Sequence, residues 1–202
     1  MNFLQSFLDE HHEEEKTSSS TEIKKSVVPK PSFDDVPSGI LLIGGCINWS
    51  DMTSKGIEGL NEYHQIKFEF KVIKTFSSAF SMHFFILLEN NDLYSMGQNK
   101  SGQLGIGELN SAINLPKKVI LPIGKKIKKV ATGRNHSLIL FENGELYGCG
   151  SNECGQGGRG DGKKNIVDIS EFAKIETLHD VKDISCGHSF SIFCDDHGEC
   201  DV

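Results

Sequence analysis

The chain has 202 residues, 37% of them apolar, and a formal net charge of −7 at pH 7. No stretch approaches the run of about 18 apolar residues that a membrane helix needs, and the N-terminus lacks a secretory signal. We therefore expect an intracellular protein, in the nucleus or cytoplasm, without a membrane span. Its six cysteines follow no paired framework, which indicates reduced thiols.

Residues 1–37 are polar and rich in Ser, Thr, Lys and Glu, with prolines in the last stretch. This composition predicts a disordered tail, because too little apolar surface is available to offset the entropy of the chain. The apolar residues between Phe3 and Leu8 share one helical face. They form either a short partner-binding helix or, as we favour, a frayed tail, since short helices are marginal in water.

The folded part is expected to begin at Ser38, with a strand over Ile40–Ile43. Residues 51–69 fit no repeat position and are interpreted as an insertion or irregular connection. The segment Lys71–Phe76 then predicts the first strand of the next unit.

The stretch from Lys128 to Asp161 predicts three strands and a glycine-rich loop. Asn143-Gly144 lies between two apolar runs and predicts a hairpin with a type I′ turn. The pattern recurs: His83–Gly97 aligns without a gap on His136–Gly150, 53 residues later. Ile40–Gly44 aligns on Leu93–Gly97, and Cys186–Phe193 on Thr132–Ile139. Partial copies at one period identify a repeat protein.

Units of short strands without helices predict an all-β fold, a partial β-propeller of about three four-stranded blades. The expected domain spans residues 38–202, with repeat units of about 38–90, 91–143 and 144–202. We expect the repeated residues of the motif to be structural; they are Gly97, Asn99, Gly102, Gln103, Gly105, Gly133, His136, Gly144, Gly150, Asn152, Gly155, Gln156 and Gly187.

No motif predicts an enzyme, a cofactor or a metal site. Cys149 and Cys154 are not zinc ligands in this interpretation, because the other copy of the repeat has Met96 and Ser101 there. The Gly157–Gly162 loop lacks the Gly-Lys-Ser/Thr ending of a phosphate-binding loop. His83 and His136 share one repeat position, which favours a structural hydrogen bond over catalysis, although Phe190 stands there in the third unit.

Lys125, Lys126, Lys128 and Lys129 form the one basic cluster of the folded part. Either the cluster is a solvated outer strand, which we favour, or it contacts an acidic partner such as a tubulin tail, DNA phosphate or anionic lipid. The acidic net charge argues for weak direct nucleic-acid binding or none.

The phrases LYSMGQNKSGQLGIGE and LYGCGSNECGQGGRGD, with VATGRNHSLIL before the second, resemble the repeat of the regulator of chromosome condensation family. That family builds seven-bladed propellers. The segments LLIGGCINWSD and CGHSFSIFCDDHGE, together with the N-terminal tail, are most similar to its telophase-disk branch, regulator of chromosome condensation 2.

The resemblance implies a propeller that binds small GTPases and mitotic structures such as microtubules, centromeres or chromatin during cell division. An alternative is a guanine-nucleotide exchange factor for a Ran-, Rac- or Arf-type GTPase. Such exchange is non-covalent and needs no catalytic residues.

Seven units of this period need far more than 202 residues. The sequence therefore leaves open a truncated chain, an incomplete gene model, or a protein that pairs with another copy through open blade edges. A fragment without a function of its own is a further alternative.

Overall fold

The computed structural model describes residues 39–44, 63–158, 168–176, 178, 180–195 and 200–201. The chain divides into two units, Met1–Asp35 and Val36–Val202, and every described residue belongs to the second. The predicted disordered tail of residues 1–37 lies outside the described residues. No helix that could cross a membrane is found among the residues that the structure describes.

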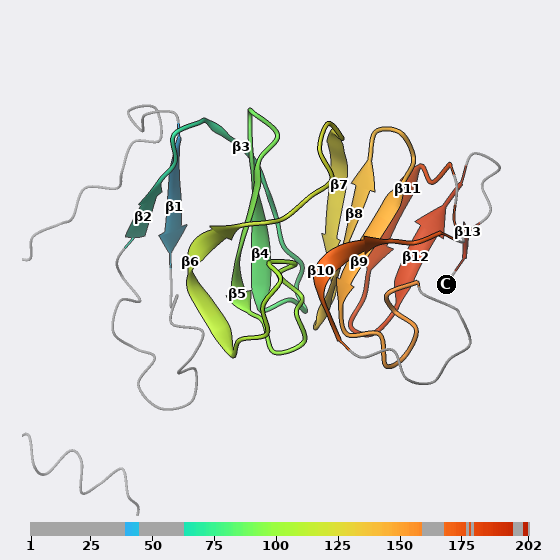
Figure 1. The fold of residues 1–202 in the computed structure, drawn as a ribbon. Coiled ribbons are helices and arrows are strands. Elements are labelled where there is room, and N and C mark those ends of the chain that lie inside the picture. Colours follow the sequence, from blue (N-terminus) through green and yellow to red (C-terminus); the bar gives the residue numbers. More distant parts are fainter. Residues whose placement is uncertain are drawn as a thin grey trace, which may run out of the picture. The chain divides into compact units, whose positions relative to one another are not determined.

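The described strands form antiparallel sheets in which sequence neighbours pair (Figure 1). The first four-stranded sheet contains β3 (Val72–Phe76), β4 (His83–Leu88), β5 (Leu93–Gln98) and β6 (Ala112–Lys118). The second contains β7 (Ile127–Thr132), β8 (His136–Phe141), β9 (Leu146–Gly150) and β10 (Ile169–Lys174). A third sheet contains β11 (Asp183–Cys186), β12 (Ser191–Cys194) and β13 (Cys200–Asp201). This is the predicted all-β architecture of successive propeller blades.

A further pair of strands precedes the first complete sheet. β1 (Ile40–Gly44) pairs with β2 (Tyr63–Lys67), with Ile40 opposite Lys67. The interpretation of residues 51–69 as an irregular connection is therefore wrong for Tyr63–Lys67. β1 aligns in sequence with β5, so β2 takes the place of β6. The sequence did not reveal β2 because these outer strands are half exposed and share no residue pattern.

The predicted repeat units of about 38–90 and 91–143 each end between the second and third strands of a sheet, whereas the unit of about 144–202 extends past β13. Each of the first two units would then contribute two strands to one sheet and two to the next. These boundaries stay a prediction.

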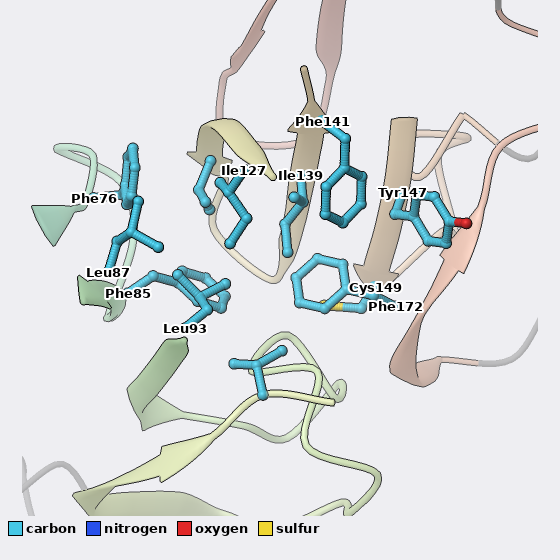
Figure 2. Close-up of a cluster of buried hydrophobic side chains, with 12 residues drawn as sticks. Phe76, Phe85, Leu87, Leu93, Ile127, Ile139, Phe141, Tyr147, Cys149 and Phe172 are labelled. Atoms are coloured by element: carbon cyan, nitrogen blue, oxygen red, sulfur yellow. The ribbon is translucent and has the colours of Figure 1, made fainter. Parts of the chain in front are cut away.

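β8 shows how one strand holds two neighbouring sheets together. All six of its residues are buried, and the last four alternate between two clusters. Ile139 and Phe141 pack with Phe85 and Leu93 of the first sheet, in the cluster shown in Figure 2. Leu138 and Leu140 pack on the opposite face, with Ile184 and Phe193 of the third sheet. Burial of each such side chain stabilises the fold by about 1.5–3 kcal/mol, which is why the strand is apolar from Leu138 to Phe141.

The β8–β9 hairpin differs from the predicted type I′ turn. Only Gly144 has a positive φ, of 80°, and Asn143 does not. The amide of Phe141 donates to the carbonyl of Glu145 (2.9 Å), and the amide of Gly144 donates to Phe141 (3.0 Å). This is a three-residue loop with a left-handed third residue. Asn91, with φ of 68°, takes the same place between β4 and β5.

Candidate interaction surface

The glycine-rich phrase of each repeat is a loop closed by its own polar side chains. Asn99 Oδ1 accepts from the amide of Leu104 (3.0 Å), and Gln103 Oε1 accepts from the amide of Ser101 (3.0 Å). The same bonds recur one period later, from Gly157 N to Asn152 Oδ1 (2.8 Å) and from Cys154 N to Gln156 Oε1 (2.7 Å). Because each side chain satisfies a backbone donor of its own loop, these repeated residues shape the loop.

The repeated glycines serve two different purposes. Gly97 and Gly150 have φ of 117° and 93°, and a Cβ on Gly97 would lie 2.5 Å from the Cα of His83. Gly133 instead leaves room for a ring, since its Cβ would lie 2.0 Å from an imidazole carbon of His136. Positive φ is also found at Gly102, Gly105, Gly144 and Gly155, whereas Gly187 leaves room for the ring of Phe190.

His83 and His136 make hydrogen bonds between sheets. His83 Nε2 lies 2.7 Å from Ser137 Oγ, and Ser137 Oγ donates to the carbonyl of Gln103 (2.8 Å). Because the single hydroxyl proton goes to Gln103, Nε2 must be the donor to Ser137. One period later, His136 Nε2 lies 3.0 Å from Ser191 Oγ, which donates to Gln156 O at 2.7 Å. We call each set the His–Ser–Gln relay.

The relays are unsuited to acid–base catalysis. Burial, followed by the influence of His136, lowers the pKa of His83 to about 3, and burial lowers that of His136 to about 4. Burial also raises the pKa of the Cys149 thiol well above its usual value. Within the described ranges no group of three His, Cys, Asp or Glu residues could hold a metal ion. The two relays are thus structural contacts between sheets.

The four predicted lysines do not form one continuous cationic surface. A register shift between Ile127 and Lys129 places Lys128 and Lys129 side by side on β7. Lys128 Nζ donates to the carbonyl of Lys182 (2.6 Å), and Lys129 pairs with Asp183 at 2.6 Å. β7 contacts the strands of both neighbouring sheets, so these lysines lie on an inner strand and not on the solvated outer strand that we favoured.

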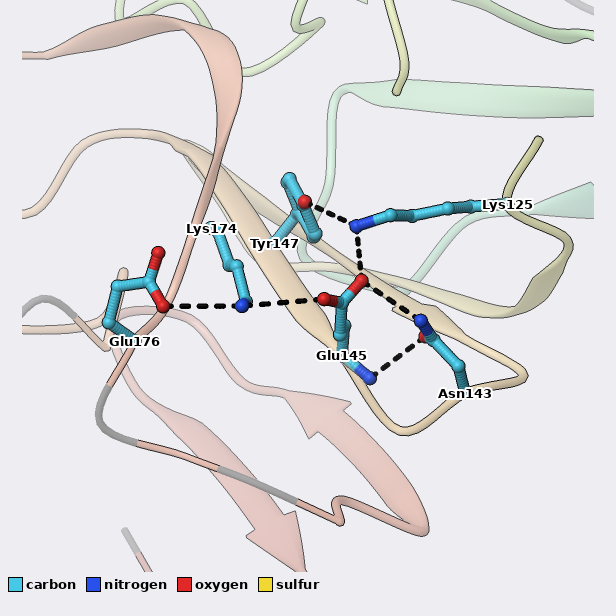
Figure 3. Close-up of polar contacts among 6 residues, drawn as sticks. All are labelled: Lys125, Asn143, Glu145, Tyr147, Lys174 and Glu176. Carbon is cyan, nitrogen blue, oxygen red and sulfur yellow. Dashed lines mark hydrogen bonds and ion pairs between the residues drawn. The ribbon is translucent and has the colours of Figure 1, made fainter. Parts of the chain in front are cut away.

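Lys125 points away from that strand into a charge network on the β8–β9 hairpin (Figure 3). Its ammonium group pairs with Glu145 and donates to Tyr147 Oη (2.7 Å). Lys174 lies 3.3 Å from the other oxygen of Glu145. Hydrogen bonds from Lys125 and Asn143 lower the pKa of Glu145 to about 2. Lys126 is exposed beside this network. Binding of an acidic partner by all four lysines stays a prediction.

Three inner loops meet at the opposite end of the strands. Phe80 from the β3–β4 loop lies edge-on to His188 of the β11–β12 loop, with ring centroids 6.2 Å apart. Arg134 from the β7–β8 loop donates its amide to His188 O (3.2 Å), and its guanidinium lies 3.1 Å from His188 Nε2. All three residues are exposed, and Phe80 is 56% exposed. We call Phe80, Arg134 and His188 the inner-loop cluster.

Sequence reasoning missed the inner-loop cluster, although a signal was present. Arg134 and His188, 54 residues apart, each directly follow the glycine of the Gly-x-x-His motif or of its copy in the third unit, and Phe80 lies in the corresponding, longer loop of the first sheet. Their side chains differ, and residue identity alone therefore did not group them. A repeat position whose members are exposed and dissimilar is where a propeller can vary its contacts.

Comparison with known proteins agrees with this architecture. The model described as "Regulator of chromosome condensation (RCC1) repeat" matches residues 90–140 and 143–194, and a second model of that description matches 127–156. Together the first two matches cover half of the chain. The chain belongs to the regulator of chromosome condensation repeat family.

Two relatives and one solved structure illustrate the family relationship. Human X-linked retinitis pigmentosa GTPase regulator is 39% identical over 110 residues, 54% of this chain and 10% of the relative. Protein RCC2 homolog of Xenopus laevis is 31% identical over 122 residues, 60% of this chain and 23% of the relative. Prp20p of Saccharomyces cerevisiae superposes with a TM-score of 0.67 at 23% identity, over 79% of this chain and 40% of that chain.

The aligned region thus spans less than half the length of each of these family members. The likeness to Prp20p shows the fold, and the match to the repeat model shows the family.

Proposed function

We propose that the chain is a non-catalytic interaction module whose inner-loop cluster binds a small GTPase. The observation that carries this proposal is that three successive sheets each place one exposed side chain in the same cluster. Aromatic and arginine side chains contribute disproportionately to protein interfaces, because they combine apolar area with directional donors. The contacts between Arg134 and His188 hold the cluster together before binding, which lowers the entropy lost on association.

The names of related proteins support a GTPase as the partner. One relative is named a GTPase regulator, and Prp20p was described with its binding properties to Gsp1p and histones. A regulator acts by binding one state of a GTPase more tightly than another, which requires a shaped surface and no reactive group. The Ran, Rac and Arf classes are the candidates that the family resemblance implies.

Direct binding of purified GTPases tests the proposal. Ran-, Rac- and Arf-type proteins would be measured on the immobilised chain as GDP, GTP-analogue and nucleotide-free forms. We expect one class to bind with a preference for one state, and Phe80→Ala or Arg134→Ala to weaken binding about tenfold. Leu115→Ala, on the exposed outer strand β6, is the matched control and should bind like the wild type. Equal binding by all variants, or none by any GTPase, would contradict the proposal.

Nucleotide exchange is the second candidate within the same proposal. If the chain prefers the nucleotide-free form, it should accelerate release of fluorescent GDP in a concentration-dependent manner. Binding of the GTPase without faster GDP release would assign the chain to regulation or recruitment of the GTPase instead.

Contact with mitotic structures is proposed through the basic residues. Lys126 and Lys128 are exposed, whereas Lys125 and Lys129 are already paired with carboxylates. Replacement of Lys125, Lys126, Lys128 and Lys129 by alanine is expected to abolish salt-sensitive pelleting with microtubules or chromatin. Pelleting that is unchanged in this variant would remove microtubules, centromeres and chromatin from the proposal.

A further inference from the structure

A cleft of about 450 Å³ lies between the β4–β5 turn and the connection from β6 to β7. The turn contributes Asn90–Asp92, and the connection contributes residues from Val119 to Lys126. The inner-loop cluster lies at the other end of the strands, because the β3–β4 loop and the β4–β5 turn are at opposite ends of β4. The cleft is therefore separate from the proposed GTPase surface.

Asn91 holds the cleft open. Its Nδ2 donates to the carbonyl of Lys125 (2.8 Å), and its Oδ1 accepts from the amide of Ile127 (3.0 Å). The length of the Asn91 side chain therefore separates the β6–β7 connection from the β4–β5 turn. Gly144 takes this place in the next repeat, where the Cα of Asp180 lies 3.2 Å from the position of an added Cβ. There the connection lies directly against the turn.

The lining of the cleft is both basic and apolar. Three lysines line the cleft: Lys118 is paired with Asp92 at 2.7 Å, the Lys125 ammonium group is paired with Glu145, and Lys126 is exposed. Ile123 is fully exposed at the rim and Leu121 lies in the lining. An excess of positive charge on a protein of net charge −7 is a local feature of this cleft.

We propose that the cleft between the β4–β5 turn and the β6–β7 connection binds an acidic peptide segment of a partner protein, with one apolar side chain of that segment against Ile123 and Leu121. The exposed Lys126 meets a peptide carboxylate at the rim. The volume suits a few residues rather than a folded domain. Charge complementarity selects the peptide, and the apolar contact distinguishes it from a simple polyanion.

Fluorescence anisotropy with a labelled octapeptide of alternating glutamate and leucine tests the proposal on the full chain. One matched peptide has serine in place of leucine, and another has glutamine in place of glutamate. We expect the glutamate–leucine peptide to bind in a salt-sensitive manner and both matched peptides to bind about tenfold more weakly.

Variants locate the site. Ile123→Ser should weaken binding of the glutamate–leucine peptide about tenfold, and Lys126→Ala should weaken it about threefold. Asn91→Gly should also weaken it, because glycine tolerates the positive φ but cannot hold the connection away from the turn. Lys128→Ala, a neighbouring exposed lysine that does not line the cleft, is the control and should bind normally. Circular dichroism of each variant confirms folding.

Three results would overturn the proposal. One is equal binding of the serine peptide, which would indicate a charged patch without an apolar site. Another is loss of binding in Lys128→Ala together with normal binding in Ile123→Ser. The third is binding of a DNA oligonucleotide or anionic vesicles in place of the peptide. Failure of GTPase binding leaves these measurements unaffected, since the two surfaces lie at opposite ends of the strands.

Discussion

His83 combines complete burial with an unused ring nitrogen. Its Nε2 donates to Ser137, whereas Nδ1 has no hydrogen-bond partner among the described residues. A proton on Nδ1 would place a charge in an apolar environment without compensation. The neutral ring is therefore required in the folded state, as the lowered pKa indicates.

We predict that the protein loses stability as the pH falls below the ordinary histidine pKa of 6.5. The folded-state pKa values, about 3 for His83 and about 4 for His136, are lower than the unfolded value, so the unfolded chain takes up the protons. Between pH 7.5 and 5 each histidine should reduce the free energy of unfolding by up to about 2 kcal/mol. Urea unfolding at both pH values measures the change.

His83→Gln provides the control for this pH dependence. Glutamine can donate to Ser137 but does not titrate, so the variant should retain about half of the pH-dependent loss. Glu145 does not contribute in this window, because it stays ionised down to a pKa of about 2. An unchanged pH dependence in His83→Gln would show that other groups cause the loss.

A second prediction at the residue scale contrasts two glycines of positive φ. Gly97→Ala places a Cβ 2.5 Å from backbone atoms of Met82 and His83, and should destabilise by about 3 kcal/mol. Gly124→Ala meets nothing within 4 Å and should cost only the left-handed conformation, about 1 kcal/mol. Thermal unfolding compares them. Similar losses in the two variants would contradict the steric explanation.

At the scale of elements, each His–Ser–Gln relay connects one sheet to the next. Ser137→Ala should leave a buried N–H of His83 without a partner and remove one of two donors to the carbonyl of Gln103, and so reduce the free energy of unfolding by about 2–4 kcal/mol. Ser95 donates within its own sheet, to Leu104 O at 3.0 Å. Ser95→Ala should therefore cost less, about 1 kcal/mol. Denaturant unfolding measures both variants. Equal losses of unfolding free energy would show that the relay between sheets adds no more stability than the hydrogen bond of Ser95.

The order of the inner strands could be predicted from the sequence. The hydrogen-bond partners that their side chains find in the neighbouring sheet could not. The shared position of His83 and His136 predicted a structural hydrogen bond, which is present. The serine partners, 54 and 55 residues away, depend on how the sheets stack. The run of lysines from 125 to 129 was interpreted as one cluster because a β-bulge and a change of direction are invisible in composition.

At the scale of the whole described fold, the second sheet packs against the sheets that precede and follow it. Its side chains belong to both hydrophobic clusters, whereas the third sheet contributes to one of them. Repeat proteins derive their stability from such contacts between neighbours.

Hydrogen exchange should follow this difference. We predict that amides of β8 and β9 exchange more slowly than those of β11 and β12, since the second sheet contributes side chains to both hydrophobic clusters and the third sheet to one. Mass spectrometry of peptides from each sheet measures this order. Uniform protection would indicate that all sheets open together as one unit.

The His–Ser–Gln relay also gives the stack of sheets a direction. Each of the two relays has its histidine on the preceding sheet and its serine on the following one. An assembly with two-fold symmetry through these faces would set histidine against histidine and leave the serines without donors. Only another sheet in the same orientation can reproduce the contact, so the sheet is a polar building block, as a subunit is in a filament with distinct ends.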